Sequence, residues 1–154
     1  MRLIILLLFL LPSSLARCGD CKEQAQIAIK FMNQYIAFRD TKVKAGQTMN
    51  VEAWLGSNNL ITKEFISGYK AEEAKGLAQD PEVGWDSDVI LNHQDYPDKG
   101  FKFLRCLEQN GYVVLQGVDW PEFPVTVRLV TTKTGVKVAG SGVVNIPENL
   151  QAKH

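Results

Sequence analysis

A change in hydrophobic period near residue 100 restricts the fold of this chain more than any other feature. Before it, apolar residues recur at helical spacing, and after it they alternate as in half-buried strands. The connections in the second half are short, which favours antiparallel neighbours. The sequence therefore predicts an α+β, cone-like fold in which three N-terminal helices pack on one curved antiparallel sheet.

Three helical segments are predicted in the first half. A long helix covers residues 20–42, with Asp20 as its N-cap and a stripe spaced as in a helix: Ala28, Phe31, Met32, Tyr35 and Arg39. One or two helical turns follow in residues 49–59. Thr62 is the expected N-cap of a third helix, which ends at Asp80-Pro81.

Four strands are predicted in the second half, over residues 101–108, 112–119, 124–132 and 136–147. Asn110-Gly111 separates the first two and is typical of a two-residue hairpin turn, because both positions tolerate positive φ. A Lys133-Thr134-Gly135 turn joins the last two. The expected sheet is an antiparallel meander.

The N-terminus, MRLIILLLFLLPSSLAR, has the pattern of a secretory signal peptide: a basic start, an apolar core and a small-residue exit. Pro12 stops the apolar run well short of the roughly 18 residues that a membrane-spanning helix needs. We expect a signal peptide at residues 1–16 and a single α+β domain at 17–154, periplasmic or secreted, with no stable membrane insertion after cleavage. Arg17 before Cys18 argues against a lipoprotein.

Three cysteines, Cys18, Cys21 and Cys106, cannot all pair within one chain. An oxidising compartment favours a structural disulfide, from Cys18 or Cys21 to Cys106 or within the first pair. The remaining thiol would be free or would join two chains, so a homodimer stays open. A redox role for the C-x-x-C spacing and a zinc site with His93 are alternatives.

Charge argues against nucleic acid as a partner. The chain carries 17 basic and 17 acidic residues, and its lysines are scattered without a basic cluster. No motif predicts a cofactor.

The stretch GWDSDVILNHQDYPDKGF, residues 84–101, gathers four aspartates, a histidine and three aromatic residues. Ile90, Leu91 and Pro97 stand where an EF-hand loop needs an oxygen ligand, Gly and Glu, which leaves only an irregular calcium site. Acid–base chemistry by His93 with Asp95 or Asp88 is a second alternative. Simple turn and cap hydrogen bonds by the aspartates are a third.

A recognition surface is a fourth interpretation, beside the alternative that the aromatic rings of the connections fill the edge of the core. Aromatic residues in stiff connections can anchor a partner with little loss of ordering entropy, and Pro121 and Pro124 stiffen the segment around Trp120. The predicted binding residues are Trp85, Asp86, Asp88, His93, Gln94, Asp95, Tyr96 and Trp120. No catalytic or metal-binding residue is predicted.

The element order, together with the runs GWDSDVILNHQDYP, GYVVL, PVTVRLV and GSGVVNIP, resembles the nuclear-transport-factor-2-like, or cystatin-like, superfold over residues 20–147. These runs look like those of a group of uncharacterised small exported bacterial proteins. The resemblance implies a pocket between the helices and the concave face of the sheet. It carries over no active-site residue, although Tyr35, Tyr69, Asp86, Asp88 and Asp95 are the residue types that an isomerase of this superfold would use.

The sequence thus predicts an exported binding protein without catalytic activity. It would recognise a protein partner, for example a toxin or envelope enzyme that it neutralises, or a small molecule. The alternative is a small pocket enzyme of the isomerase, dehydratase or hydrolase type on the same fold.

Overall fold

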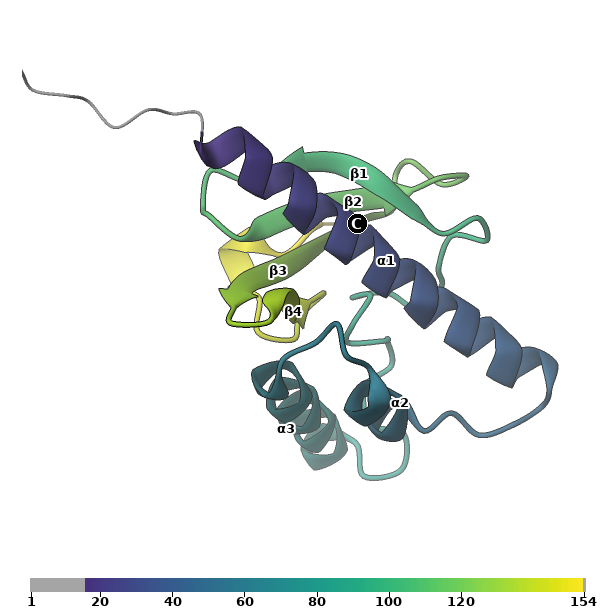
Figure 1. Ribbon diagram of the computed structural model, residues 1–154. Coiled ribbons are helices and arrows are strands. Elements are labelled where there is room, and N and C mark those ends of the chain that lie inside the picture. The colour runs from purple at the N-terminus through teal and green to yellow at the C-terminus, as the bar shows by residue number, and fades with distance from the viewer. Residues whose placement is uncertain (1–15, 154) are drawn as a thin grey trace, which may run out of the picture.

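The computed structural model describes residues 16–153, with side chains from Cys21 onward (Figure 1). Apart from its last position, the predicted signal peptide lies outside the described residues. The elements in chain order are α1 Ala16–Lys44, α2 Val51–Ser57, α3 Lys63–Gln79, β1 Phe101–Cys106, β2 Tyr112–Gly117, β3 Pro124–Thr132, β4 Gly135–Ser141 and a 3₁₀ turn, η1, at Glu148–Leu150. Within the described residues, no helix is both long enough and apolar enough to cross a membrane.

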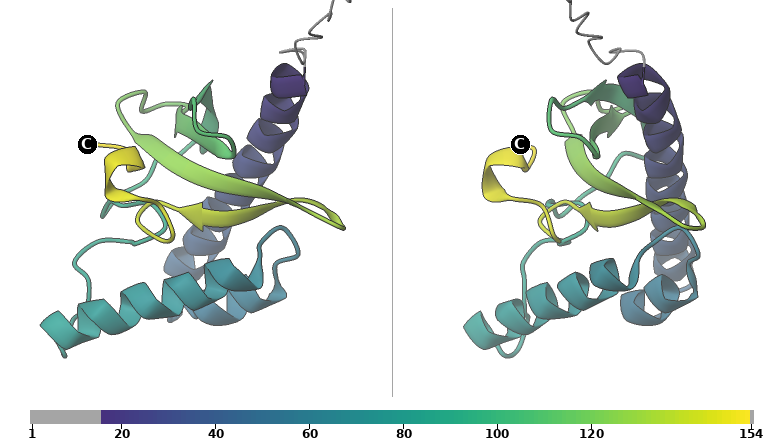
Figure 2. Two further views of the ribbon diagram at one scale, coloured as in Figure 1. Left: turned by 90° about the vertical axis from the view of Figure 1, so that its left-hand side faces the viewer. Right: turned by 60° about the vertical axis from the view of Figure 1, so that its left-hand side comes forward.

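The four strands form one antiparallel sheet in the order β1-β2-β3-β4. This confirms the α+β class and the predicted meander. Helix α1 lies against one face of the sheet, and the C-terminal segment around η1 lies on the other side (Figure 2). Between them, Val125, Val127 and Leu129 of β3 are buried, as their alternation predicts.

The three helices have different positions relative to the sheet. Helix α1 contacts all four strands, whereas α3 contacts β4 and α2 contacts α3. The α2–α3 pair lies beyond the β4 side of the sheet (Figures 1 and 2). Trp54 of α2 joins this pair to α1, because its ring packs within 5.9 Å of Phe31 and 5.3 Å of Phe38, measured between ring centroids. The long helix therefore covers the sheet, and the short ones extend the core past its edge.

Helix ends follow the predicted caps only in part. The Thr62 hydroxyl accepts a hydrogen bond from the Phe65 amide at 3.1 Å, which confirms it as the N-cap of α3. Asp20 was predicted to cap α1 but lies inside that helix, which begins at Ala16. Ala16 and Arg17 are good helix formers and extend the helix by one turn upstream.

The β1–β2 turn corrects the prediction from Asn110-Gly111. Strand β1 ends at Cys106, so the connection has five residues, and of the pair only Gly111 has positive φ, at 85°. The Gly111 carbonyl accepts a hydrogen bond from the Leu129 amide of β3 at 2.6 Å. This link to a third strand fixes the glycine in a wider loop than the local rule predicts.

The last predicted strand also ends early, at Ser141. Gly142 has φ of 63° and lies in a tight turn in which Ser141 and Val144 exchange backbone hydrogen bonds of 2.9 and 3.0 Å. A side chain at Gly142 would meet the Val89 carbonyl at 2.4 Å. The turn therefore brings the C-terminal segment against residues 89–90.

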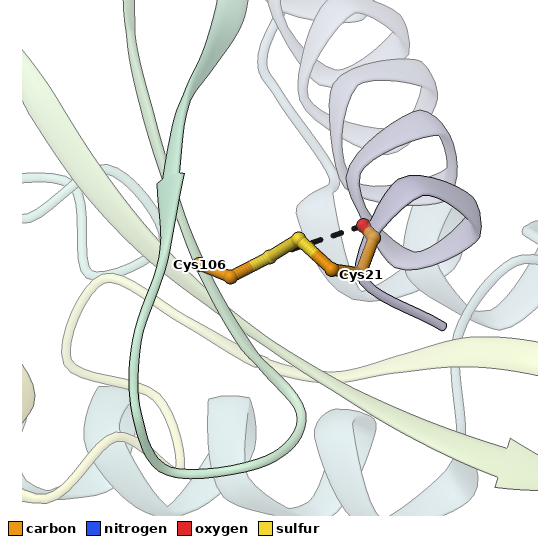
Figure 3. Close-up of a disulfide and its surroundings, with 2 residues drawn as sticks. All are labelled: Cys21 and Cys106. Atoms are coloured by element: carbon orange, nitrogen blue, oxygen red, sulfur yellow. Dashed lines mark hydrogen bonds between the residues drawn. A yellow bond between two sulfur atoms is a disulfide. The ribbon is translucent and has the colours of Figure 1, made fainter. Parts of the chain in front are cut away.

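A disulfide joins Cys21 in α1 to Cys106 at the end of β1, 85 positions apart, with a Cα–Cα distance of 6.3 Å (Figure 3). The Cys106 sulfur also lies 3.9 Å from the Cys21 carbonyl oxygen. Of the alternative pairings, this is the one that the structure contains, and Cys18 lies outside it. The bond holds the start of α1 against the first edge of the sheet.

Candidate functional site

A surface cleft of about 630 Å³ lies between α1, α3 and the connection from α3 to β1. Its lining combines residues from these elements and from the α1–α2 segment: Tyr35, Arg39, Met49, Val51, Tyr69, Glu73, Trp85, Asp86, Ser87, Asp88, Val89 and Gln94. A second hollow of about 620 Å³, between the outer face of the sheet and the C-terminal segment, contains none of the predicted binding residues. The first cleft is therefore the candidate site.

Asp88 is the structural centre of this cleft. Its Oδ1 accepts hydrogen bonds from the backbone amides of Ile90 and Leu91 at 2.8 and 3.0 Å. Its Oδ2 accepts one from the Tyr35 hydroxyl at 2.6 Å and forms an ion pair with the Arg39 guanidinium. The Arg39 and Asp88 side chains are only 12% and 11% exposed. One carboxylate thus fastens the connection to α1 through Tyr35 and Arg39, and holds its own loop through the amides of Ile90 and Leu91.

The loop around Asp88 is closed by its own backbone. The Asp88 amide donates to the His93 carbonyl at 3.0 Å, and the Asn92 amide donates to the Asp88 carbonyl at 2.7 Å. Asn92 has φ of 58°, a conformation that asparagine tolerates better than most residues. Turn hydrogen bonds of this kind are one of the alternatives predicted for the aspartates of residues 84–101. At Asp88 they occur together with the contacts to Tyr35 and Arg39.

Helix α3 supplies a second wall. The Trp85 indole donates to the Glu72 carbonyl at 2.6 Å, and a side chain at Gly76 would meet Trp85 at 2.7 Å. Gly76 thus allows the tryptophan to lie directly on the helix. Tyr69 and Glu73, one turn apart on α3, both line the cleft.

Burial and negative charge shift the titration of the cleft residues. Burial raises the pKa of the Tyr35 hydroxyl well above its usual value, and the charge and hydrogen bond of Asp88 add to this. Burial, followed by the charge of Glu73, also raises the pKa of Tyr69. The pKa of Glu73 itself is raised by burial and by the negative charge of Asp88. All three raised pKa values mean that the surroundings favour the neutral form of these side chains.

The predicted binding residues divide into separate groups. Trp85, Asp86, Asp88 and Gln94 line the cleft, where the Gln94 amide donates to Asp86 at 2.9 Å. The other four lie outside its lining: His93, Asp95, Tyr96 and Trp120.

His93 and Trp120 pack together beside Phe123, with ring centroids 5.6 Å apart for the first two and 4.8 Å apart for His93 and Phe123. The Asp95 amide donates to His93 Nδ1 at 3.0 Å, while the Asp95 side chain is exposed. Trp120 is 36% exposed. These residues therefore form a second cluster that is distinct from the cleft.

Tyr96 lies outside the cleft lining and contacts two residues of α1. Its hydroxyl donates to Asp40 at 2.9 Å, and the Arg39 guanidinium lies 4.8 Å from the centre of its ring. Burial and the hydrogen bond to Asp40 raise the pKa of Tyr96. Arg39 is thus held between Tyr96 and the Asp88 carboxylate.

Metal-binding alternatives find no support in this arrangement. Among residues 21–153, whose side chains the structure describes, no three His, Cys, Asp or Glu side chains come close enough to hold a metal ion together. Asp86, Asp88 and Asp95 are not such a group, and Cys21 and Cys106 are bonded to one another.

Two charged cleft residues were absent from every predicted site, Arg39 and Glu73. Both are spaced at i, i+4 from a tyrosine, in Tyr35–Arg39 and Tyr69–Glu73, so each pair lies on one face of its helix. Two such pairs of a tyrosine with a charged residue are a signal that could have identified these helix faces as functional.

No family model, curated protein or solved structure matches this chain. The function is therefore argued from the geometry of the cleft.

Proposed function

We propose that this chain is an exported, periplasmic or secreted, binding protein without catalytic activity of its own, and that it recognises its ligand at the cleft beside Asp88. The preformed cleft is the observation that carries the proposal. Four hydrogen bonds to Asp88 fix the 84–94 connection before any ligand arrives, so little ordering entropy is lost on binding.

The roles of the cleft residues favour binding over chemistry. Both oxygens of Asp88 are engaged, and Arg39 is held between Asp88 and Tyr96. A general base needs a carboxylate with room to take a proton from a substrate, which Asp88 lacks. Its contacts are those of a residue that shapes a surface.

Export is supported by the N-terminal pattern and by the disulfide. Residues 1–16 read as a signal peptide, and the Cys21–Cys106 bond is of a kind that persists in oxidising compartments. The superfold resemblance fits the same proposal, because many of its members bind ligands or partners without catalysis. The occupant is either a protein, for example a toxin or envelope enzyme that is neutralised, or a small molecule.

A paired-variant binding assay tests this function. Asp86 and Gln94 are exposed and bond to one another at the cleft, so Asp86→Ala/Gln94→Ala should remove recognition without unfolding the chain. Glu64 and Arg128 form a comparable surface pair, at 2.8 Å, outside the cleft lining, so Glu64→Ala/Arg128→Ala is the matched control.

We expect ligands from a metabolite and peptide library to shift the amide resonances of residues 85–94 in the wild type and the control, and to lose most of that effect in the cleft variant. Ligands that shift only resonances outside the cleft, or that bind both variants equally, would contradict the assignment.

A second candidate is a pocket enzyme of the isomerase, dehydratase or hydrolase type. The observation that favours it is Glu73, which lines the cleft beside Tyr69 and whose pKa is raised by burial and by the charge of Asp88, as suits a general acid or base. If it is correct, a substrate screen should find turnover that Glu73→Gln reduces by about 100-fold or more. Turnover that survives this change would exclude Glu73 as the acid or base.

A further inference from the structure

The cleft has an excess of negative charge that its own residues do not balance. Four charged side chains line it: Arg39, Glu73, Asp86 and Asp88. Arg39 and Asp88 neutralise one another as an ion pair. Glu73 and Asp86 remain: Asp86 accepts a hydrogen bond from the neutral Gln94 amide, and Glu73 lies one turn from the neutral Tyr69 on α3.

The charged groups around the cleft do not change this balance. Lys70 lies beside the cleft-lining Tyr69 in sequence but is paired with Glu52 at 2.6 Å, and Lys75 is paired with Glu72 at 2.6 Å. Each pair sums to zero charge. The cleft therefore keeps two uncompensated carboxylates, which come from two different elements, α3 and the connection that follows it.

Tyr69 lies in the field of one of these carboxylates. Burial raises the pKa of Tyr69 most, and the negative charge of Glu73 is the next largest cause. A positive charge placed in the cleft would be attracted by the same carboxylate. The charges that line the cleft therefore favour a cationic ligand.

The remaining lining suits a cation with an aliphatic stem. Trp85 is partly exposed and provides aromatic surface, which attracts cations through the negative faces of the ring, whereas Tyr35 and Tyr69 are buried behind it. Arg39, over the ring of Tyr96, already shows such a contact beside the cleft. Apolar surface for a stem comes from Met49, Val51 and Val89.

We propose that the cleft binds an organic cation, an alkylammonium or guanidinium group carried on an aliphatic stem. The group could belong to a free amine or to a lysine or arginine side chain of a partner, because both present the same chemistry. This inference rests on the proposed binding function and adds to it the class of ligand.

Calorimetric titration with chemically matched probes tests the inference. The small-molecule arm uses 1,5-diaminopentane, with 1,5-pentanediol as the neutral analogue and glutarate as the anionic one. The peptide arm uses a blocked Gly-Lys-Gly tripeptide against its norleucine counterpart. We expect binding of the cationic member in at least one arm, and the arm that binds more tightly identifies the source.

Charge-removing variants locate the binding. Glu73→Gln/Asp86→Asn should weaken binding of the cationic probe about tenfold, because two partly exposed carboxylates each contribute under about 1 kcal/mol. Glu64→Gln/Glu82→Gln removes the same charge outside the cleft lining and should change the affinity less than about twofold.

Two results would overturn the inference in distinguishable ways. Equal binding of the neutral probe, or unchanged affinity in Glu73→Gln/Asp86→Asn, would reject the cation while leaving a cleft that binds another ligand. Failure of every probe, together with library ligands that shift no cleft resonance, would reject the proposed binding function as well.

Discussion

At the scale of single residues, Asp88 has the largest structural role in the cleft. It accepts two backbone hydrogen bonds within its loop and bonds to Tyr35 and Arg39, which lie 53 and 49 positions away. The Arg39 Nε is buried without a hydrogen-bond partner, so the guanidinium depends on Asp88 for compensation. Removing the carboxylate would leave a buried cation unpaired.

Asp88→Ala should therefore lower the free energy of unfolding by about 3 kcal/mol or more, measured by urea denaturation. Asp88→Asn keeps one acceptor for the loop amides and should lose less. Asp86→Ala, at an exposed position, should cost under about 0.5 kcal/mol. Equal effects at positions 86 and 88 would show that the Asp88 contacts do not form in solution.

Tyrosine titration gives a pH dependence with a definite sign. Burial raises the folded-state pKa of Tyr35 above its ordinary value of 10.0. The neutral hydroxyl then contributes stability that is fully present below about pH 10 and is lost as pH rises through the folded-state pKa. The free energy of unfolding should therefore fall above about pH 10.

Tyr35→Phe should be less stable than the wild type at neutral pH, since the hydrogen bond to Asp88 is lost, but should lose less stability between about pH 9 and pH 11. Urea denaturation across this range measures both effects. A phenolate absorbance that the Tyr35→Phe variant lacks, rising near pH 10 while the chain is still folded, would contradict the shift.

At the scale of residues, the sequence identified several cleft residues but not the residues that they contact. The stretch of residues 84–101 stands out by composition, and Asp88 and Trp85 do line the cleft. Their contacts with Tyr35 and with α3 depend on how the helices pack, which no local pattern contains. His93 was grouped with them by proximity in sequence and Trp120 as an aromatic residue in a stiff connection, but the fold places both in a separate cluster with Phe123.

At the scale of elements, local signals succeeded where the cap or turn is self-contained. Thr62 bonds its own helix at Phe65, and the Lys133-Thr134 turn joins β3 to β4 as predicted. Asn110-Gly111 failed because a backbone bond from Leu129 of β3 holds the glycine. A rule for two strands cannot anticipate a contact with the third.

The disulfide belongs to this scale because it joins the start of α1 to the end of β1. Closing a loop of 85 positions should stabilise the fold by about 4.6 kcal/mol in the chain-entropy model. Cys106→Ala should lower the free energy of unfolding by about that amount in denaturant titrations.

Cys18→Ala is the control for this prediction and should change stability little. Mass spectrometry of the non-reduced protein should find Cys21 linked to Cys106 and the alkylatable thiol at Cys18. A Cys18–Cys21 or Cys18–Cys106 link would contradict the pairing.

At the scale of the whole molecule, other segments bond to one position on each edge of the sheet. The Asn33 side chain bonds the backbone of Phe101 in β1 in both directions, at 2.7 and 3.4 Å. On the other side, β4 exchanges hydrogen bonds of 2.8 and 3.0 Å with residues 60–62 through Val138. These contacts tie α1 to the start of β1 and the α2–α3 connection to β4.

Phe31 packs between the three helices and can be used to test whether the helices and the sheet unfold together. It is fully buried in α1 and packs against Trp54 of α2 and Phe65 of α3, with ring centroids 5.9 and 5.6 Å apart. Phe31→Ala should lower the free energy of unfolding by about 3 to 5 kcal/mol. Phe103→Ala, at a side chain 43% exposed on β1, should cost about 1 kcal/mol or less.

Because one core joins the sheet to α2 and α3, the Phe31→Ala variant should still unfold in one transition, with coincident curves from far-ultraviolet circular dichroism and tryptophan fluorescence. Trp54 reports the helical side, since its ring lies against Phe31, while Trp120 in the β2–β3 connection reports the sheet side. Two separated transitions would mean that the α2–α3 pair folds as its own unit, and the predicted single domain at 17–154 would then be wrong.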